Sequence, residues 1–440
     1  MNAVPAAWIG PRGVAALAGL AVGAGLVATV VAWPVVVTAA AIVALAAFAA
    51  DAAALAVGLE FERAAPPPLM LARSAAFTYT ITNRAPIALR FAIAEAPIER
   101  LQIDPELARG WVPARARTTA RVDVVPRQRG RSATGIAFAW FESPLGLVRR
   151  RVRFGRIEPL RIRPDLSALE RGGDLAQRSR LIDAGLRRVR QRGGGSEFES
   201  LREYAAGDPY RSIDWKATAR RTKVMVAQYE VERSQQIVIA LDAGRLMTPR
   251  LGDRRKLDYA VSAGLGLAAM AQTAADRVGL HAFAGSTLAA IAPRAGASHA
   301  AALNDALSEL DPRFEESDYE RAALELRQRY RKRSLIVVFT DLFDPVASGT
   351  VLASLALLVP RHLVLVVLMN DAAIGDARAR EPVRVADAYR AAVATTLTLE
   401  RERAVVLLRS RGVGVVDVPA RDLTLALLDA YVDIKTRALL

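Results

Sequence analysis

Three aspartates that follow apolar, strand-like runs are the residues best placed to do chemistry in this chain. Asp242 ends "QIVIALD", Asp341 ends "SLIVVFTD", and Asp344 comes three residues later. Paired carboxylates are the minimum equipment for holding a divalent cation that activates water or polarises a phosphoryl group. Mg²⁺ requires six oxygens in near-octahedral array, so the remaining ligands would have to be hydroxyls, water or substrate.

The hydroxyls that would complete such a site are missing from the turn after Asp242. A metal-binding turn of this kind has hydroxyls two and four residues after its aspartate, and here those places hold Gly244 and Leu246. Thr248 or Ser286 could substitute, although the spacing does not require either. We therefore interpret the turn as a degenerate metal site that serves as a protein-binding surface, with no cofactor expected and Mg²⁺ as the less favoured alternative.

Composition excludes several other kinds of site. The 440 residues include no cysteine, which rules out disulfides, zinc thiolates and cysteine nucleophiles. The three histidines, His281, His299 and His362, are far apart in sequence, so each is more simply a core or surface residue than a metal ligand. The "GGG" run lacks the Gly-Lys-Ser/Thr of a nucleotide-binding loop. A formal net charge of +15 favours anionic neighbours: lipid head groups, nucleic acid or an acidic protein.

An apolar run without charge extends from Gly13 to Ala50. Its 38 residues suit two bilayer crossings of about 20 residues each, with Trp33-Pro34 at the turn between them. We predict a transmembrane helical hairpin within residues 1–58, with helices at about 13–32 and 34–56. A cleaved signal peptide is the alternative, but its apolar core is normally about 7–15 residues.

The charges that flank this run predict its orientation. Arg12 precedes the first helix, Arg63 and Arg73 follow the second, and the turn carries no charge. Because positive flanks stay in the cytoplasm, we place both ends, and everything after residue 60, on the cytoplasmic side of the inner membrane. Asp51 is expected near the interface at the end of the second helix, and a functional carboxylate inside the membrane is the alternative.

Short alternating segments over residues 59–165 predict a small β-sandwich. In "AAFTYTITN", Phe77, Tyr79 and Ile81 alternate with smaller or polar residues, and similar runs follow between Pro, Gly and Asn. The segment "RRRVR", Arg149 to Arg153, is most simply a solvated strand face. Contact with anionic lipid is the second interpretation, because this domain follows the membrane segment directly.

Residues 166–235 form a predicted connector, in which "LIDAGLRRVRQR" could be a basic amphipathic helix that "GGG" ends. Over residues 236–440, apolar strands alternate with helices. This pattern predicts an α/β domain with a doubly wound parallel sheet buried on both faces. Ligands of such sheets bind beyond the carboxyl ends of the strands, which is where Asp242 and Asp341 lie.

The densest set of charged and aromatic residues, "GSEFESLREYAAGDPYRSIDWKATAR", belongs to the connector. It resembles the signature of the bacterial family called domain of unknown function fifty-eight, whose pattern is Glu-Phe, Arg-x-Tyr-x-x-Gly-Asp, Arg-x-Ile-x-Trp and Ala-Arg. The matching residues are Glu197, Phe198, Arg202, Tyr204, Gly207, Asp208, Arg211, Ile213, Trp215, Ala219 and Arg220. So many fixed spacings rarely coincide, and the likeness covers nearly the whole chain.

The resemblance implies a domain organisation and a partner. It implies an N-terminal membrane hairpin, a β-rich region and a C-terminal domain similar to von Willebrand factor type A. Family members are typically encoded beside MoxR-type AAA+ ATPases, so it also implies a membrane-tethered partner of such an ATPase, together with other membrane proteins of the same operon. The activity of the family is poorly defined, and no catalytic residue carries over from it.

Two interpretations of the signature are open. In the first, its Arg–carboxylate pairs and Trp215 hold the segment onto the A-type domain, since bidentate Arg pairs fix geometry. In the second, the segment is an exposed docking face, because Trp, Tyr and Arg dominate the hot spots of protein interfaces.

The chain is accordingly predicted to be a non-enzymatic adaptor or scaffold that acts with a MoxR-type ATPase in the assembly or maturation of protein complexes. A divalent-metal-dependent hydrolase that uses Asp242, Asp341 and Asp208 is the alternative. Nucleic-acid binding through "RRVRQR" and "ARRTK" is disfavoured, because charge alone is present without a recognisable reading module.

Overall fold

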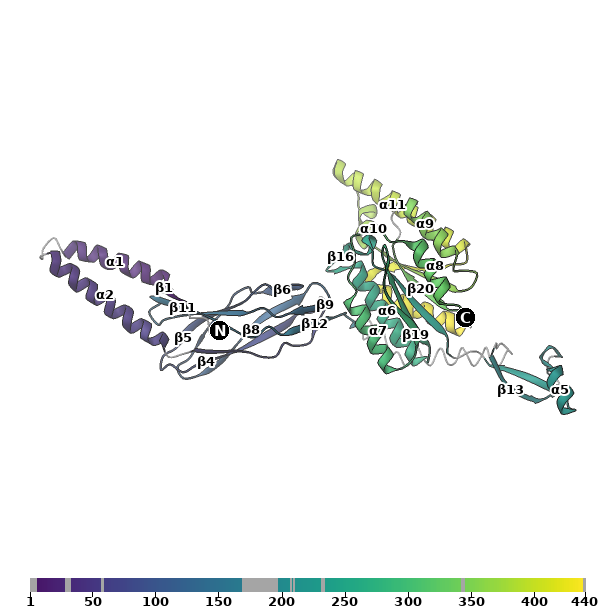
Figure 1. Cartoon of the computed structure of the whole chain (residues 1–440). Helices are drawn as coiled ribbons and strands as arrows, with labels where there is room; N and C mark the ends of the chain where they lie inside the picture. The colour runs from purple at the N-terminus through teal and green to yellow at the C-terminus, as the bar shows by residue number, and fades with distance from the viewer. Residues whose placement is uncertain are drawn as a thin grey trace. The chain divides into compact units, whose positions relative to one another are not determined.

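The computed structural model describes residues 6–27, 33–56, 59–167, 197–205, 208, 210–230, 234–341 and 345–437. The chain forms two compact units, Met1–Arg163 and Pro164–Leu440 (Figure 1). The basic helix predicted in the connector lies outside the described residues. The finer domain boundaries at residues 58, 165 and 235 stay predictions.

A β-rich domain in the first unit is built from two main sheets around one core. The five-stranded sheet has the order β1-β11-β10-β5-β7, the four-stranded sheet has the order β2-β4-β8-β6, and β3-β12-β9 form a third, short sheet. Phe77, Tyr79 and Ile81 of β4 face the shared core, as the alternation predicted, together with Ile93 and Phe141 of the larger sheet. The strands are β1 (Ala6–Ile9), β2 (Leu59–Arg63), β3 (Leu69–Met70), β4 (Ala75–Asn83), β5 (Leu89–Glu95), β6 (Leu101–Asp104), β7 (Ala108–Val112), β8 (Arg117–Pro126), β9 (Gly130–Ala133), β10 (Ala137–Glu142), β11 (Val148–Phe154) and β12 (Pro159–Arg163).

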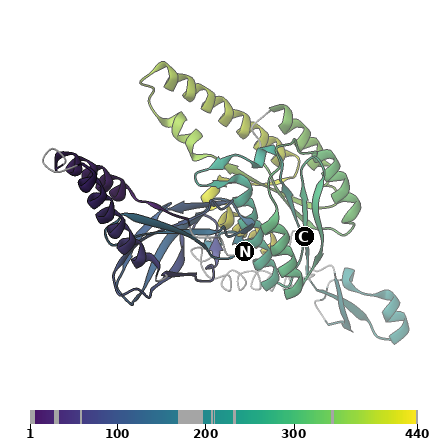
Figure 2. The ribbon, with the colours of Figure 1, turned by 60° about the vertical axis from the view of Figure 1, so that its left-hand side comes forward.

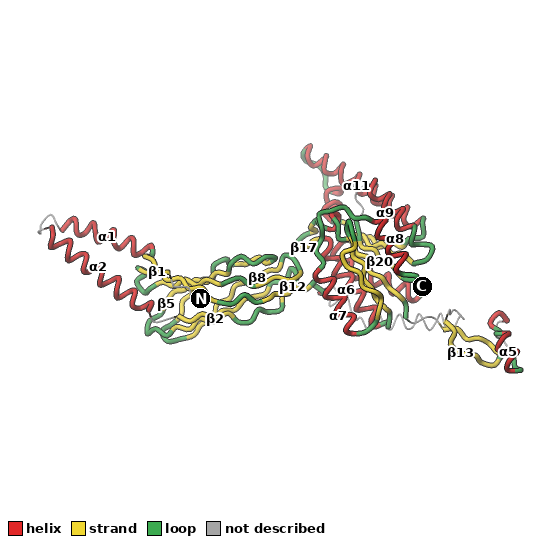
Figure 3. Tube along the Cα trace, viewed as in Figure 1, coloured by secondary structure: helices red, strands yellow, loops and turns green. Residues whose placement is uncertain are grey.

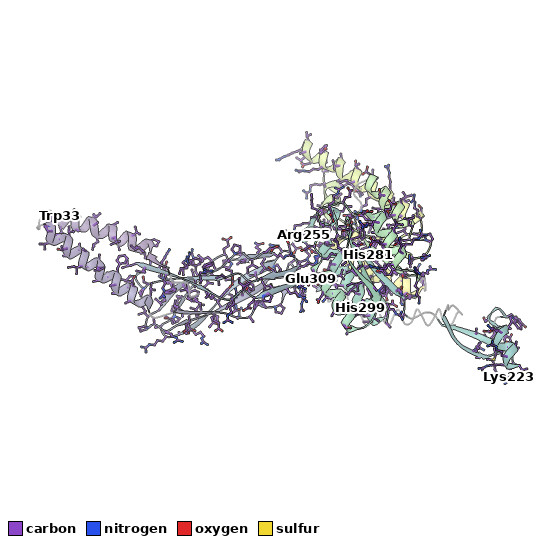
Figure 4. The ribbon with its side chains drawn as sticks, in the orientation of Figure 1. Trp33, Lys223, Arg255, His281, His299 and Glu309 are labelled. Carbon is purple, nitrogen blue, oxygen red and sulfur yellow. The ribbon has the colours of Figure 1, made fainter. Side chains whose placement is uncertain are left out.

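Two apolar helices, α1 (Pro11–Val27) and α2 (Trp33–Ala56), run side by side beyond one end of this domain (Figures 1 and 2). Over Trp33–Ala53, α2 is long and apolar enough to cross a membrane, whereas α1 is apolar but shorter. Trp33 lies at the end of α2 that is farther from the strands (Figure 4). The expectation of an apolar N-terminal helix is confirmed, and by length and composition α2 could anchor the chain in a membrane.

The first helix is fastened to the turn of residues 143–147, which joins β10 to β11. Strand β1 pairs with β11 from Ala6 to Ile9, and the next residue, Gly10, donates its N–H to Leu147 O at 2.7 Å. A Cβ at Gly13 would lie 2.4 Å from Leu147 O, so only glycine lets α1 begin this close to the turn. The sequence pattern did not predict β1, which precedes the apolar run.

Asp51 joins the second helix to the same turn. Its buried carboxylate accepts hydrogen bonds from Ser143 Oγ, from Leu145 N at 3.0 Å and from Leu147 N at 3.1 Å. Arg150 Nη1 donates to Leu55 O at 3.0 Å. This contact places a cation at the C-terminal end of α2, where it interacts favourably with the negative end of the helix dipole. The one acidic residue of α2 is therefore part of the junction between the apolar helices and the β-rich domain.

The C-terminal α/β domain has a six-stranded sheet of order β19-β18-β15-β20-β21-β22. Five strands are parallel, whereas β19 pairs antiparallel with β18 at the edge. The prediction of an entirely parallel sheet was therefore wrong at this edge, because the small residues of "TLAAIAPR" do not stand out as a strand. The strands are β15 (Gln236–Asp242), β18 (Arg277–Phe283), β19 (Thr287–Arg294), β20 (Leu335–Phe339), β21 (Leu363–Asn370) and β22 (Gly414–Pro419).

Helices cover both faces of this sheet (Figure 3). On one face α6, α7 and α12 pack against Ile237, Ile239 and Leu241 of β15; on the other, α8, α9 and α11 pack against Val238 and Ala240. The helices are α6 (Lys256–Thr273), α7 (Ala297–Glu309), α8 (Tyr319–Arg329), α9 (Pro345–Ala356), α10 (Ala372–Ala379), α11 (Val385–Ser410) and α12 (Leu423–Thr436). Before α6, β16 (Arg250–Leu251) pairs with β17 (Arg254–Arg255) in a short hairpin.

A buried aspartate fastens α12 at the amino-terminal edge of the sheet. Asp276, just before β18, accepts hydrogen bonds from Tyr431 OH at 2.6 Å, Lys435 Nζ at 2.8 Å and Gln235 N at 2.9 Å. Burial raises the pKa of Asp276, although Lys435 and Tyr431 oppose the shift. The last helix is thus held by a polar contact as well as by its apolar face.

His281, on β18, is a core residue. It is completely buried inside the C-terminal domain (Figure 4), and neither ring nitrogen has a hydrogen-bond partner within the described part of the chain. Burial lowers the pKa of His281 to about 4, although Glu325, whose Oε2 lies 3.9 Å from Nε2, opposes the shift. At neutral pH the ring is therefore uncharged.

Acid should weaken the C-terminal domain through His281. The pKa is about 4 in the folded chain and 6.5 in the unfolded chain, so between these values only the unfolded state binds the proton. The free energy of unfolding should fall by about 3 kcal/mol as the pH drops through this window. Hydrogen exchange of the β18 amides at several pH values measures the loss locally. His281→Leu should remove the dependence and His299→Gln should keep it; equal acid sensitivity in all three chains contradicts the assignment.

Candidate functional site

Asp242 ends the central strand β15 with its carboxylate completely buried. Four donors surround it. Gly244 N at 2.8 Å and Ser317 Oγ at 2.5 Å donate to Oδ1, while Tyr319 OH at 2.6 Å and Thr340 Oγ1 at 2.9 Å donate to Oδ2. Each carboxylate oxygen therefore already accepts two hydrogen bonds.

The hydroxyl that the sequence lacks two residues after Asp242 is supplied by another loop. A Cβ at Gly244 would lie 2.1 Å from Ser317 Oγ and 2.9 Å from Glu315 O, so no serine fits at position 244 while Ser317 is in place. The backbone fixes this arrangement, because Arg245 N donates to Glu315 O at 2.7 Å. The absence of a side chain at Gly244 thus leaves room for the Ser317 hydroxyl of the second loop.

Sequence reasoning missed these hydroxyl donors. They are Ser317, Tyr319 and Thr340 rather than Thr248 or Ser286, and Thr248 Oγ1 lies instead 3.5 Å from Gly244 O. Ser317 and Thr340 are 75 and 98 residues from Asp242 along the chain, so no local spacing could have revealed them.

Tyr319 acts as a permanent donor to Asp242. Burial, with the Asp242 charge beside it, raises the pKa of Tyr319 well above its ordinary value of 10.0. The phenol therefore keeps its proton at every physiological pH. Its ring packs edge-on against Phe283 with centroids 5.6 Å apart, which fixes the hydroxyl over the carboxylate.

Asp341, the next residue after Thr340, is neutralised by two basic side chains. The first residue of α6, Lys256, donates through Nζ to Oδ2, and Arg401 of α11 donates through Nη1 to Oδ1 at 2.8 Å. Arg401 also holds Asp417 of β22, through Nη2 at 2.9 Å and Nε at 3.1 Å. Burial lowers the pKa of Lys256 despite Asp341. For Arg401, hydrogen bonds to Asp417 and the charge of Asp341 outweigh burial and raise the pKa.

The described residues do not fit a divalent cation at this edge. The oxygens of Asp242 are occupied by neutral donors, those of Asp341 by two cations, and those cations would repel a metal ion. Asp344, the third residue of the predicted metal set, lies outside the described residues. Within the described ranges, no group of three or more His, Cys, Asp or Glu side chains could hold a metal ion. The carboxylates at this edge are therefore already paired within the chain.

A cavity of about 290 Å³ opens beside this network at the carboxyl edge of the sheet. Its charged lining residues are Asp371, Arg378, Arg401, Glu402 and Asp417. Because both acidic and basic groups line it, the cavity offers charges of both signs to a polar ligand.

The signature segment forms a small unit of its own secondary structure. Strand β13 (Glu197–Glu203) pairs antiparallel with β14 (Met225–Glu230), and between them lie a short 3-10 turn (Tyr210–Ser212) and helix α5 (Trp215–Arg221). Glu197 and Phe198 are in β13 and Arg211 is in the 3-10 turn, but their side chains, like Gly207 as a whole, lie outside the described residues.

Arg202 and Asp208 form the fixed contact of this segment. Arg202 Nη1 and Nη2 donate to the two carboxylate oxygens of Asp208, each at 2.6 Å, and Ala205 N adds a bond of 2.9 Å. The bond from Arg202 lowers the pKa of Asp208 to about 2, and the pair raises the pKa of Arg202. This bidentate pair closes the loop between β13 and the 3-10 turn, so the carboxylate that the hydrolase alternative requires is already bound.

Two aromatic residues of the signature, Tyr210 and Trp215, are exposed. Trp215 is 67% exposed and Tyr210 78% exposed, and the Tyr204 and Tyr210 rings lie 6.1 Å apart. Asp214 caps α5 by accepting from Ala217 N at 2.9 Å, which leaves Trp215 as the first residue of the helix. Arg220, in the last turn of α5, is also exposed.

Titration calorimetry of the full chain with MgCl₂ and MnCl₂ should show no saturable binding. A cation at Asp242 would have to displace four hydrogen bonds, and one at Asp341 would have to displace an ammonium or a guanidinium. Micromolar affinity that Asp242→Ala abolishes would contradict this interpretation.

Lys256→Met should destabilise the C-terminal domain by about 3 kcal/mol, because it leaves the buried Asp341 carboxylate short of one counter-charge. Hydrogen exchange of the β20 amides measures the local effect. The double variant Lys256→Met with Asp341→Asn removes the charge as well and should recover most of the loss. If the double variant is no more stable than the single one, charge compensation is not what Lys256 provides.

Comparison with known proteins places this chain among uncharacterised relatives. It is 26% identical over 181 residues to the "Uncharacterized protein Rv1480" of Mycobacterium tuberculosis and to the "Uncharacterized protein Mb1516" of Mycobacterium bovis, over 41% of this chain. The match spans 56% of the length of these curated relatives.

Solved structures give only distant likenesses. The conserved hypothetical protein BatB from Bacteroides thetaiotaomicron matches at a TM-score of 0.27 and 13% identity, over 46% of this chain and 99% of that one. A PapD-like domain of human CEP192 matches at a TM-score of 0.20 and 11% identity, over 24% and 85%.

The family model gives the decisive match. Residues 200–405, which run from within the signature through most of the C-terminal sheet, match the model described as "Protein of unknown function DUF58". The resemblance drawn from the signature residues is confirmed, and this part of the chain is similar to that family.

Proposed function

We propose that the protein is a membrane-tethered, protein-binding adaptor that acts with a MoxR-type AAA+ ATPase in the assembly or maturation of protein complexes. The observation that carries the proposal is the exposed aromatic and basic surface of the signature segment. The ATPase itself is suggested by the family resemblance and not by any contact in the chain.

The signature surface, defined here as Tyr210, Trp215, Lys216, Arg220, Arg221 and Lys223, has the composition of a binding hot spot. The segment already has an apolar interior of its own in Ile213, Met225, Val226 and Ala227, to which Trp215 and Tyr210 do not contribute. Large aromatic rings left outside such an interior are the usual anchors of protein interfaces. Four basic side chains beside them favour an acidic partner surface (Lys223 is labelled in Figure 4).

The C-terminal domain, which we take to be similar to von Willebrand factor type A, supports binding rather than hydrolysis. The two carboxylates that a metal-dependent hydrolase would need are occupied by hydroxyl donors and by Lys256 and Arg401. The geometry thus gives the hydrolase alternative less support than the adaptor.

The chain connections favour a hairpin as the membrane tether. Strand β1 precedes α1 and strand β2 follows α2, yet both strands belong to the same β-rich domain. If α1 and α2 enter a bilayer, the chain must therefore return to the side from which it started, which two crossings achieve and one does not. The flanking arginines favour the cytoplasm for that side, with the anchor in the inner membrane.

Trp215→Ala should lower recovery of the ATPase more than about tenfold when the full chain is captured from detergent-solubilised membranes with a non-hydrolysable ATP analogue. A central Trp in a hot spot contributes about 2 kcal/mol or more, and 1.4 kcal/mol is a factor of ten. Phe314→Ala, which truncates another highly exposed ring, is the matched control and should leave recovery unchanged.

The fold of each variant is checked by hydrogen exchange of β13 and β14. A folded Trp215→Ala chain that still recovers the ATPase at the original level would overturn docking at this surface. Loss of protection in β13 and β14 would instead support a structural role for Trp215.

A further inference from the structure

The outer face of the five-stranded sheet in the β-rich domain is dominated by arginine and aromatic side chains. Strands alternate their side chains, and in β10 Ala137, Ala139 and Phe141 face the core. Their neighbours therefore face outward, as do the residues paired with them across the sheet. This arginine–aromatic face comprises Arg90, Arg109, Trp111, Phe138, Trp140, Glu142, Arg149, Arg151 and Arg153.

The face is strongly cationic and only partly neutralised. Five arginines stand against one acid, Glu142, which pairs with Arg149, so four positive charges remain in excess. The guanidinium groups of Arg151 and Arg153 lie 5.8 and 5.9 Å from the Phe138 ring centroid, which holds them over an aromatic surface. Arg150 is the exception in "RRRVR", since it turns inward to Leu55 O and the Phe141 ring. The run is therefore not a uniform solvated strand.

The pairing register orders these side chains by their distance from the apolar helices. Arg149, Glu142, Arg90 and Trp111 form one row, in which Arg149 pairs with Trp8 of β1, shortly before the chain enters α1. Arg151, Trp140 and Arg109 form the next row, about 7 Å farther away because two strand residues rise by that much. The surface potential of an anionic membrane decays over about 8–10 Å. Both rows would therefore lie within reach of head groups at the base of α1 and α2.

A cavity occupies the middle of these two rows. It measures about 460 Å³ and is lined by Arg90, Arg109, Trp140, Glu142 and Arg149 among others. Three arginines line this cavity, and although Glu142 pairs with Arg149, Arg90 and Arg109 suit a phosphate, which arginine binds through paired hydrogen bonds. Trp111, which pairs with Arg90 across the strands and is 64% exposed, is the side chain type that settles at the boundary between head groups and hydrocarbon.

We propose that the arginine–aromatic face binds the phosphate-bearing head groups of anionic phospholipids, and that the cavity receives one of them. The inference rests on the proposed membrane tether, because that tether brings the first row to head-group depth. It assigns the β-rich domain a function of its own, which is to bind the bilayer surface beside the helices and so to fix the domain against the membrane.

The test uses the full chain purified in a zwitterionic detergent. Native mass spectrometry measures binding of phosphatidylglycerol and of phosphatidylcholine with identical acyl chains. The double variant Arg90→Gln with Arg109→Gln should bind phosphatidylglycerol about thirtyfold more weakly, since each basic side chain near the surface contributes about 1 kcal/mol. Binding of phosphatidylcholine should not change. Arg117→Gln with Arg121→Gln removes the same charge from the exposed side of β8 and should leave both affinities unchanged.

Three outcomes would overturn the proposal. Equal losses in the two double variants would mean that net charge alone attracts the lipid. If the original chain shows no preference for phosphatidylglycerol over phosphatidylcholine, the face is not a site for anionic lipid. Binding of soluble glycerol phosphate or inorganic phosphate that depends on Arg90 and Arg109, without a lipid preference, would assign the cavity to a soluble ligand.

The experiments distinguish failure of the lipid-binding proposal from failure of the proposed adaptor function. The Arg90 and Arg109 double variant leaves the signature surface intact, so recovery of the ATPase should stay at the original level. If the original chain does not remain in carbonate-washed membranes, the tether is wrong, and with it the basis of the lipid proposal.

Discussion

Two carboxylates buried completely at the carboxyl edge of one sheet determine how the C-terminal domain is arranged. Removing an ion from water costs several kcal/mol unless partners replace the lost hydration. Asp242 obtains them from Ser317, Tyr319 and Thr340, and this draws the loop before α8 over the end of β15. Asp341 obtains them from Lys256 and Arg401, and this fastens α6 and α11 to β20. The positions of these helices follow from charge compensation as much as from apolar packing.

Buried aspartates also join separate elements at two other places in the chain. Asp276 binds α12 through Tyr431 and Lys435 at the opposite edge of the sheet, and Asp51 binds α2 to the turn between β10 and β11. In each case one buried aspartate holds elements that are distant in sequence. Since such contacts are directional, they fix the geometry of an element more closely than an apolar face does. A domain built this way presents its outer surfaces in fixed positions, which suits a recognition role.

The sequence predicted what depends on local pattern and missed what depends on distant pairing. Val/Ile/Leu runs predicted the strands that carry Asp242 and Asp341, and alternation predicted Phe77, Tyr79 and Ile81 as core residues. The signature spacings were enough to identify the likeness to the family whose model matches residues 200–405. Strand β1 was missed because four residues before an apolar run have no visible partner until β11 forms. Ser317, Lys256 and Arg401 were missed because each meets its aspartate only in the folded chain, and nothing in "KLDYAV" or "LERERAVV" distinguishes a buried base from a solvated one.

Strand β1 also has a consequence for the order of biosynthesis. Ala6–Ile9 leaves the ribosome first, but its partner β11 follows only after both apolar helices and nine further strands have been translated. Until then the N-terminal segment has no sheet to join. Synthesis of the helix pair therefore precedes completion of the five-stranded sheet, and pairing of β1 with β11 joins the segment before α1 to the folded domain.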